Sequence, residues 1–251
     1  MQALRAKEVW FTYDGVDYVL RGATLTAEPG QVLVLAGPTG CGKSTLLMIL
    51  AGLLKPERGS VTLDGAPLHA VLEEDRSIVG IVFQNPDDQL FNPTVYDEIA
   101  YAPRTLGLPE EKVRRMVVET AERLGIAGLL DKPPYRLSMG QKRLVALAST
   151  LVYQPQILLL DEPSTFLDRR GLRIVEETIR EYREMKRIVV VATHNVDMVL
   201  GHADKVCFIE EGRTRCIPRH RITLDTLADT SLPIPSFTRS LLEKCMHVGG
   251  D

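Results

Sequence analysis

One short stretch of the chain has the residue types and spacing that bind phosphate. It fits the pattern G-x-x-x-x-G-K-[ST] and reads Gly37-Pro38-Thr39-Gly40-Cys41-Gly42-Lys43-Ser44-Thr45. Its glycines let backbone N–H groups turn inward around phosphate oxygens, and a following helix adds the positive end of its dipole. Lys43 is placed to reach the β- and γ-phosphates, and the Ser44 hydroxyl to ligate Mg²⁺. The stretch, which we call the phosphate loop, predicts nucleotide binding.

A pair of neighbouring carboxylates supplies further chemistry. Asp161 and Glu162 directly follow the apolar run 158–160. In parallel α/β sheets, the carboxyl ends of such strands converge on the ligand crevice. Asp161 is placed to hold Mg²⁺, directly or through water, and Glu162 to polarise an attacking water. Two surface acids that merely end a strand are the alternative interpretation.

These motifs need elements that position them, and the hydrophobic pattern predicts alternating strands and helices. Strand-like runs occur at 8–13, 20–26, 32–36, 60–63, 78–83, 157–160, 188–192 and 206–209. Helical patterns cover 43–54, most of 85–154 and about 170–185. Thr94 with Asp97, and Ser138 with Gln141, are expected to cap helices. The alternation predicts an α/β fold with a parallel sheet, interrupted by a helical insertion.

Length and composition narrow the class of protein. The 251 residues suit one large domain with a short appendage, and 30 basic against 33 acidic residues give a net charge of −3. This balance argues against nonspecific nucleic-acid binding. The longest nearly apolar run, 46–54, is too short to span a bilayer and the first residues lack a signal-peptide core, so a cytosolic protein is expected. The cysteines have no C-x-x-C spacing, so neither a zinc site nor a disulfide framework is expected.

Further motifs occur in the order of a known family. Leu137–Gln141 reads L-S-M-G-Q, which resembles the signature L-S-G-G-Q of ATP-binding cassette (ABC) ATPases. The stacking aromatic, the Q-loop glutamine, the D-loop and the switch histidine of that family match Tyr13, Gln84, 164–168 and His194. The resemblance covers about 3–217 and implies an ABC-type P-loop NTPase fold. Such a fold has a RecA-like parallel-sheet core, an antiparallel β subdomain and an inserted α-helical subdomain.

The resemblance implies roles for the matched residues, with ATP and Mg²⁺ as cofactors. Tyr13 would stack on the adenine. The implied catalytic residues are Glu162, His194 and Gln84, and the implied Mg²⁺ ligands are Ser44, Gln84 and Asp161. Asp168 of the D-loop would contribute to nucleotide binding.

The signature residues imply a dimer. In this family the signature caps the ATP of a second, head-to-tail subunit, and Ser138, Gly140 and Gln141 would do so here. Ser138 and the Gly140 amide at a helix N-terminus suit a γ-phosphate. The site would then be complete only in a two-fold assembly around two ATP molecules. Both homodimers and heterodimers remain open.

Two residues depart from the family pattern. Met139 replaces the first glycine of the signature, and Phe166 stands in the D-loop where a small residue is usual. Met139 adds bulk at the expected dimer seam, and Phe166 is expected to pack against the partner subunit or to constrain the D-loop. Because Lys43, Glu162 and His194 are present, we expect an active site.

A longer match indicates a subtype. The stretch 83–91 reads F-Q-N-P-D-D-Q-L-F, followed by P-T-V at 93–95, and is similar to ATPase subunits of energy-coupling factor (ECF) importers of the cobalt/nickel branch. The segment 224–242 resembles the short tail of that group. A generic ABC Q-loop region is the alternative interpretation.

The resemblance implies a peripheral subunit at the cytoplasmic face of the cell membrane. Its partners would be an integral membrane scaffold, docked in a groove beside Gln84, and a membrane component that selects a metal ion or a vitamin.

The sequence also bears on functions other than that of a transporter ATPase. ABC ATPases that act on ribosomes typically carry two cassettes and DNA-repair members a long coiled coil, whereas this chain has one phosphate loop and no heptads. No nucleic-acid partner is expected. A regulatory nucleotide-binding subunit with low turnover is the third alternative. The expected domains are an ATPase domain at 1–219, with its helical subdomain at about 86–155, and an appendage at 220–251.

Overall fold

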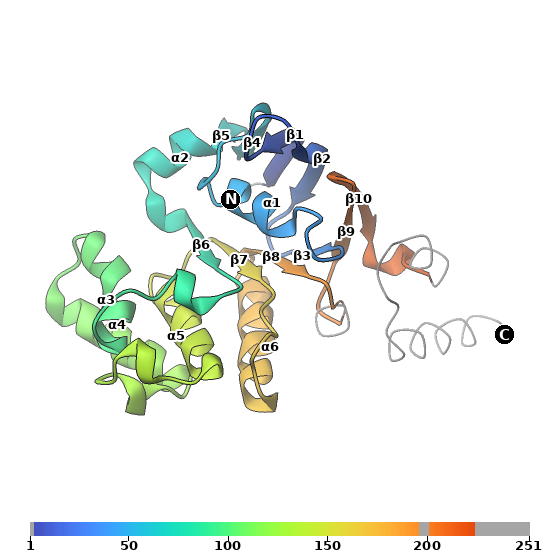
Figure 1. Cartoon of the computed structure of the whole chain (residues 1–251). Coiled ribbons are helices and arrows are strands. Elements are labelled where there is room, and N and C mark those ends of the chain that lie inside the picture. Colours follow the sequence, from blue (N-terminus) through green and yellow to red (C-terminus); the bar gives the residue numbers. More distant parts are fainter. Residues whose placement is uncertain (1–2, 196–200, 224–251) are drawn as a thin grey trace.

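A six-stranded, mostly parallel sheet forms the centre of the molecule (Figure 1). The computed structural model describes residues 3–195 and 201–223. The strand order is β10 (Arg213–Pro218), β9 (Lys205–Glu210), β3 (Val32–Ala36), β8 (Ile188–Thr193), β7 (Ile157–Asp161), β6 (Val79–Val82). All neighbours pair in parallel except β9 and β10, which are antiparallel. The carboxyl ends of β3, β6, β7 and β8 therefore share one edge, as the motifs at these strand ends require.

A second, antiparallel sheet covers one face of the first. Its order is β2 (Tyr18–Ala27), β1 (Leu4–Thr12), β4 (Arg58–Leu63), β5 (Ala66–Pro67). Tyr13 follows β1 directly. Helix α1 (Lys43–Leu50) lies between the two sheets in Figure 1, and α2 (Leu68–Glu74) lies beside them.

The strands of the central sheet bury both faces. Along β3, Leu33 and Leu35 join the apolar cluster that contains α1 and the antiparallel sheet, whereas Val32 and Val34 join the cluster on the other face. That second cluster contains α6 (Arg169–Glu184) and the helical insertion. Continuous apolar strands of this kind are typical of parallel sheets with both faces covered.

The insertion between β6 and β7 consists of helices. They are α3 (Val95–Thr105), α4 (Glu110–Arg123) and α5 (Met139–Leu151), with three short 3₁₀ turns at Pro86–Asp88, Ala127–Leu129 and Pro134–Arg136. The Thr94 hydroxyl accepts from the Asp97 amide, and Ser138 and Gln141 form a reciprocal capping box at the start of α5. Both predicted caps are confirmed. The expected ABC-type α/β fold is confirmed as well.

The expectation of no disulfide is wrong for one pair of cysteines. The structure joins Cys207 and Cys216 by a disulfide, because the β9–β10 register places these two residues directly opposite each other. Strand β10 itself was not predicted, nor were α2 and β5. The predicted tail segment 224–242 lies outside the described residues. Every helix in the described ranges is too short or too polar to cross a bilayer.

Candidate nucleotide-binding and catalytic site

A cavity of about 290 Å³ opens at the shared carboxyl edge of the strands. It brings together the aromatic residue after β1, most of the phosphate loop, and the residues predicted to be the Q-loop glutamine, the catalytic carboxylate and the switch histidine. The residues that line it are Tyr13, Val19, Thr39, Gly40, Gly42, Lys43, Ser44, Thr45, Gln84, Glu162 and His194. Residues that are far apart in the sequence thus converge on one site.

The phosphate loop has a backbone that only glycine adopts readily at two positions. Gly40 and Gly42 have φ angles of 83° and 103°, in the left-handed region. A Cβ on Gly42 would also lie 2.9 Å from the Leu20 side chain, so this glycine allows a close approach to β2. Helix α1 begins at Lys43, next to Gly42, so its N-terminal amides lie at the loop. Such a loop is suited to anionic oxygens.

Lys43 reaches back across the phosphate loop. Its side chain is buried, and Nζ donates to the carbonyl oxygens of Gly37 and Pro38 at 2.8 and 3.0 Å. Nζ also lies 4.0 Å from Oε1 of Glu162. The ammonium group is thus held between the loop and the catalytic carboxylate, where it can meet a terminal phosphate.

Asp161 provides an unpaired oxygen at the end of β7. The residue is 4% exposed, and among the described residues its Oδ1 has no hydrogen-bond partner. Burial raises the pKa of Asp161, while a hydrogen bond with Ser44 opposes the shift. A buried carboxylate oxygen beside a hydroxyl is the donor chemistry that Mg²⁺ prefers, so these residues fit the metal.

Glu162 is held on both carboxylate oxygens by Thr193, the last residue of β8, and by His194, which follows it. Oε1 accepts from the His194 amide at 2.8 Å and lies 2.7 Å from His194 Nδ1, and Oε2 accepts from Thr193 Oγ1 at 3.0 Å. Its φ of 45° is unusual for a non-glycine residue and is typical of functional positions. The geometry fixes one carboxylate at the cavity, with an exposed imidazole beside it.

Two residues that contribute to this site were missed by sequence reasoning. Thr193 orients Glu162, and its only signal was a hydroxyl residue at the end of a buried strand. Arg143 lies behind the cavity, where it binds the backbone of Gln84 and Glu162 at 2.9 and 2.8 Å. No sequence signal distinguishes Arg143 from other helical arginines.

Several predicted nucleotide-binding residues do not line this cavity. Ser138, Gly140 and Gln141 lie at the N-terminus of α5, and Asp168 caps α6 by accepting from the Gly171 amide at 2.8 Å. Their roles stay predictions. Three residues of the phosphate loop also do not line this cavity. Gly37 packs against Cys41, and Pro38 and Cys41 line a different cavity beside β9 and β10.

The two residues that depart from the family pattern lie at the signature, Met139 within it and Phe166 beside it. Phe166 is 54% exposed with φ of 67°, and its carbonyl oxygen would lie 2.8 Å from a Cβ on Gly140. Met139 is half-buried at the first turn of α5. The ring of Phe166 is therefore exposed, and its packing against a partner subunit or constraint of the D-loop stays a prediction.

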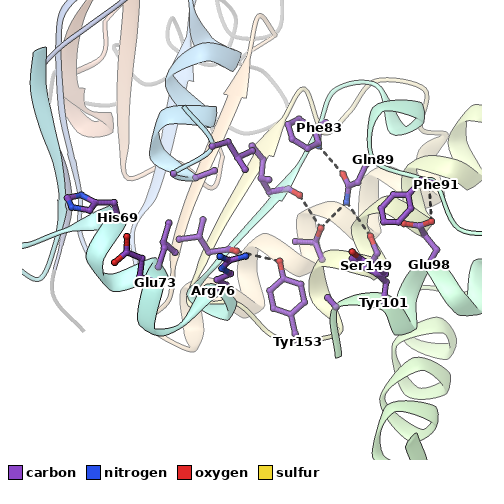
Figure 2. A pocket seen from close by; sticks show the side chains of 18 residues that line it. His69, Glu73, Arg76, Phe83, Gln89, Phe91, Glu98, Tyr101, Ser149 and Tyr153 are labelled. Carbon is purple, nitrogen blue, oxygen red and sulfur yellow. Dashed lines mark hydrogen bonds between the residues drawn. The ribbon is translucent and has the colours of Figure 1, made fainter. Parts of the chain in front are cut away.

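A groove of about 530 Å³ separates the core from the helical insertion (Figure 2). One wall comes from the end of α1, from α2 and from β6, and the other from α3 and α5. Phe91 and Tyr101 meet edge to face at 5.0 Å and are 68% and 49% exposed. Gln89 lies between the walls and is hydrogen-bonded to both, as Figure 2 shows.

Comparisons with known proteins agree with this geometry. The ABC transporter family model matches residues 20–165. The chain is 39% identical over 216 residues to the energy-coupling factor transporter ATP-binding protein EcfA of Methanocaldococcus jannaschii, covering 85% of this chain and 77% of that protein. A solved structure of cbiO1 from Clostridium perfringens, described as part of the ABC transporter complex cbiONQ, is 32% identical with a TM-score of 0.76. It covers 98% of this chain and 96% of cbiO1.

A more distant structure shares the domain but not the whole protein. A bacterial Atm1-family ABC exporter with ATP bound is 27% identical with a TM-score of 0.77, and the match covers 90% of this chain and 42% of the exporter. The matched family model, the EcfA relative and the convergent site agree. The chain belongs to the ABC transporter family and is one of its ATP-binding, ATP-hydrolysing components.

Proposed function

We propose that this chain is the ATPase subunit of an ECF-type importer for a metal ion, cobalt or nickel, or for a vitamin. The observation that carries the proposal is the cavity in which Lys43, Gln84, Glu162 and His194 converge beside the unpaired oxygen of Asp161. The importer type is supported by the names of the relatives, an energy-coupling factor ATP-binding protein and a part of the cbiONQ complex.

The residues of the cavity divide the work of ATP hydrolysis. Lys43 and the amides of the phosphate loop would hold the phosphates. Ser44 and Gln84 of the cavity, with Asp161 at the end of β7, would hold Mg²⁺, which would supply charge neutralisation. Glu162 accepts the proton of the attacking water, because its carboxylate is fixed at the cavity with its oxygens directed by Thr193 and His194. The His194 side chain, half exposed beside Glu162, contacts the terminal phosphate.

The proposed subunit works as a dimer. Ser138 is exposed at the N-terminus of α5, so its hydroxyl and the neighbouring amides are available to the nucleotide of a second subunit. A two-fold, head-to-tail pair would complete both sites at once, and either a homodimer or a heterodimer satisfies this geometry. Tyr13 is 61% exposed at the rim of the cavity, where its ring meets Phe11 edge to face at 4.9 Å and its hydroxyl lies 3.2 Å from Thr45 Oγ1. The exposed part of the ring would stack on adenine.

The groove of Figure 2 is the proposed docking site for the integral membrane scaffold. Exposed aromatic residues at a groove are typical anchors of protein interfaces, and Phe91 and Tyr101 provide two. Docking there would place the chain at the cytoplasmic face of the membrane. A substrate-binding membrane component would join the same complex.

The test combines hydrolysis with recovery of the complex. ATP turnover of the purified chain is measured with Glu162→Gln as the inactive control, and the same two proteins are used to recover partners from native membranes solubilised in mild detergent. We expect Glu162→Gln to abolish turnover, to form a dimer on a sizing column with Mg-ATP, and to recover a multi-span scaffold with a small membrane component.

Three outcomes would contradict the proposal. Equal turnover in both proteins would exclude this site as the catalyst and leave a regulatory subunit. Recovery of ribosomal or other soluble partners alone would indicate an ATPase that is not coupled to transport. A monomer at saturating Mg-ATP would contradict the dimer.

A further inference from the structure

Helix α5 carries a buried cation to which the motifs assign no role. Arg143 is 2% exposed, and its guanidinium donates to four backbone carbonyl oxygens, those of Phe83, Gln84, Asp161 and Glu162. Burial lowers the pKa of Arg143 to about 10, so the group stays charged at neutral pH. A guanidinium has a planar fork of donors, which lets one side chain bind several acceptors in a fixed arrangement.

The four acceptors belong to two different segments of the active site. Phe83 and Gln84 form the Q-loop after β6, whereas Asp161 and Glu162 end β7. Arg143 itself belongs to the helix that begins at the signature residues. One side chain therefore joins the helical insertion, the Q-loop and the strand that carries both carboxylates.

The backbone of Glu162 needs this support. Its left-handed φ of 45° is unfavourable for a side chain with a Cβ, and such a conformation persists only when the surroundings hold it. The Glu162 amide donates to the Ala192 carbonyl at 2.8 Å, and its own carbonyl accepts from Arg143 at 2.8 Å. The backbone amide and the backbone carbonyl of Glu162 are thus both hydrogen-bonded to neighbouring elements.

The Q-loop is also hydrogen-bonded to α5 through Gln89, which lines the groove. Gln89 accepts from the Phe83 amide at 3.2 Å and donates to the hydroxyls of Ser149 and Thr150 at 3.2 Å (Figure 2). It also donates to the Ala146 carbonyl at 3.0 Å. Gln89, Ser149 and Thr150 all line the groove. A displacement of α5 would therefore move Gln84, through Gln89 on one side and Arg143 on the other.

We propose that Arg143 is a positioning residue that transmits the position of α5 to Gln84 and Glu162. The inference rests on the proposed function, because the groove occupant is what would displace α5. Arg143 is not among the residues that line the cavity; it acts through the carbonyl groups that set the two catalytic side chains. Its loss lowers turnover while the phosphate loop, which it does not contact, still binds ATP.

The test uses two variants of the full-length chain. Arg143→Ala removes the guanidinium, and Arg143→Lys keeps the charge but not the planar fork. For both we expect kcat to fall by about 100-fold, the effect of a displacement near 1 Å at a catalytic group, with ATP affinity close to wild type. Added guanidinium ion, at concentrations well below those that unfold proteins, is expected to restore turnover of Arg143→Ala, and methylammonium is not.

Lys142→Ala is the matched control. It removes the neighbouring cation of the same helix, whose ion pair with Asp87 at 2.6 Å involves a carboxylate that is 53% exposed. Lys142 itself is 13% exposed, but it donates to this solvated carboxylate and not to the carbonyl groups that Arg143 binds, so kcat of this variant is expected to stay at the wild-type value.

The outcomes separate this inference from the proposed function. Wild-type kcat in a folded Arg143→Lys variant, with Glu162→Gln inactive, overturns the positioning role alone. Retained turnover in Glu162→Gln overturns the proposed function. If Arg143→Ala does not fold, Arg143→Lys decides; loss of ATP binding in parallel with kcat in that variant would indicate a structural role and would also overturn the inference.

Discussion

At the scale of single residues, the two neighbouring carboxylates are held very differently. Both oxygens of Glu162 have partners at the end of β8, whereas Oδ1 of Asp161 has no partner among the residues that the structure describes. An unpaired buried carboxylate reduces folding stability, because the charged form loses its hydration without compensation. Asp161 is thus a position where function and stability are opposed.

Replacing Asp161 by Asn should therefore stabilise the protein when Mg²⁺ and nucleotide are absent. Burial raises the pKa of Asp161 above its ordinary value, so the folded state binds the proton more tightly than the unfolded state. Stability contributed by this group falls as pH rises from about 4 through the folded pKa. At pH 7 we expect a Tm about 2–4 °C above wild type, the shift that about 1 kcal/mol gives for a chain of this size.

Thermal melts of the two proteins across pH test this expectation. The difference in Tm should shrink as the pH falls through the folded pKa of Asp161, because the wild-type carboxyl then gains a proton. Mg-ATP should raise the Tm of the wild type more than that of Asp161→Asn. A lower Tm for Asp161→Asn at pH 7 would contradict the assignment of Asp161 as an unpaired carboxylate.

The residues of the site differ in how well they can be predicted from the sequence. The phosphate loop and the Asp161–Glu162 pair are short patterns whose chemistry depends on residues close together in the chain. Arg143 and Thr193 have roles that depend on backbone and side-chain acceptors brought together by the fold. Since backbone carbonyls leave no mark on the sequence, no pattern of residue types predicts such contacts.

At the scale of elements, the first turn of α5 lies against the D-loop of the same chain. A Cβ on Gly140 would lie 2.8 Å from the Phe166 carbonyl oxygen, closer than real contacts allow. Gly140 has therefore an intramolecular reason to lack a side chain, beside its predicted role toward a second subunit. The close approach fixes the signature relative to the segment that follows Glu162.

Gly140→Ala should move α5 or the D-loop and lower stability by about 1–3 kcal/mol, as overpacking does. Because the contact lies within one chain, we expect the Tm to fall without nucleotide, and kcat to fall with it. Gly128→Ala is the control, since a Cβ there would meet nothing within 4 Å. An unchanged Tm with reduced ATP-dependent dimerisation would assign the glycine to the partner subunit alone.

Elements with strong local signals were predicted, and weakly patterned ones were not. The capping box at Ser138 and the apolar strands of the core have patterns that can be recognised in the sequence. Helix α2 buries only Leu68, so it lacks the apolar stripe by which helices are recognised. Strand β10 has no apolar run and forms by pairing with β9, while Thr214 is also hydrogen-bonded to the Thr24 backbone of β2. The Cys207–Cys216 disulfide depends on the register between β9 and β10.

At the scale of the whole molecule, the groove and the catalytic cavity are connected through the Q-loop. Gln84 lines the cavity, whereas Phe83 and Gln89 line the groove. Residues a few positions apart thus face two different sites. A variant at the outer rim of the groove should therefore weaken docking without altering the chemistry.

Phe91→Ala with Tyr101→Ala provides this variant. Loss of an aromatic anchor of an interface costs about 2 kcal/mol of binding, so we expect roughly 30-fold weaker association with the membrane scaffold. ATP turnover of the isolated chain is expected to stay at the wild-type value. Tyr135→Ala is the control, as this aromatic residue is 75% exposed and does not line the groove. Association is measured by titrating each variant into scaffold reconstituted in detergent or nanodiscs, and equal affinity of both variants would exclude the groove.

The parallel pairing of β6 and β7 restricts how this protein can be shortened. The chain leaves β6 at Val82, returns at Ile157 to the opposite end of the neighbouring strand, and passes through the helices on the way. Parallel neighbours require a long crossover and cannot be joined by a tight turn. A minimal ATPase made by excising the helices and closing the gap with a few glycines would thus force β7 to reverse its direction. The helical insertion is a structural bridge, and a truncated protein that retains the phosphate loop would lose the strand that carries its carboxylates.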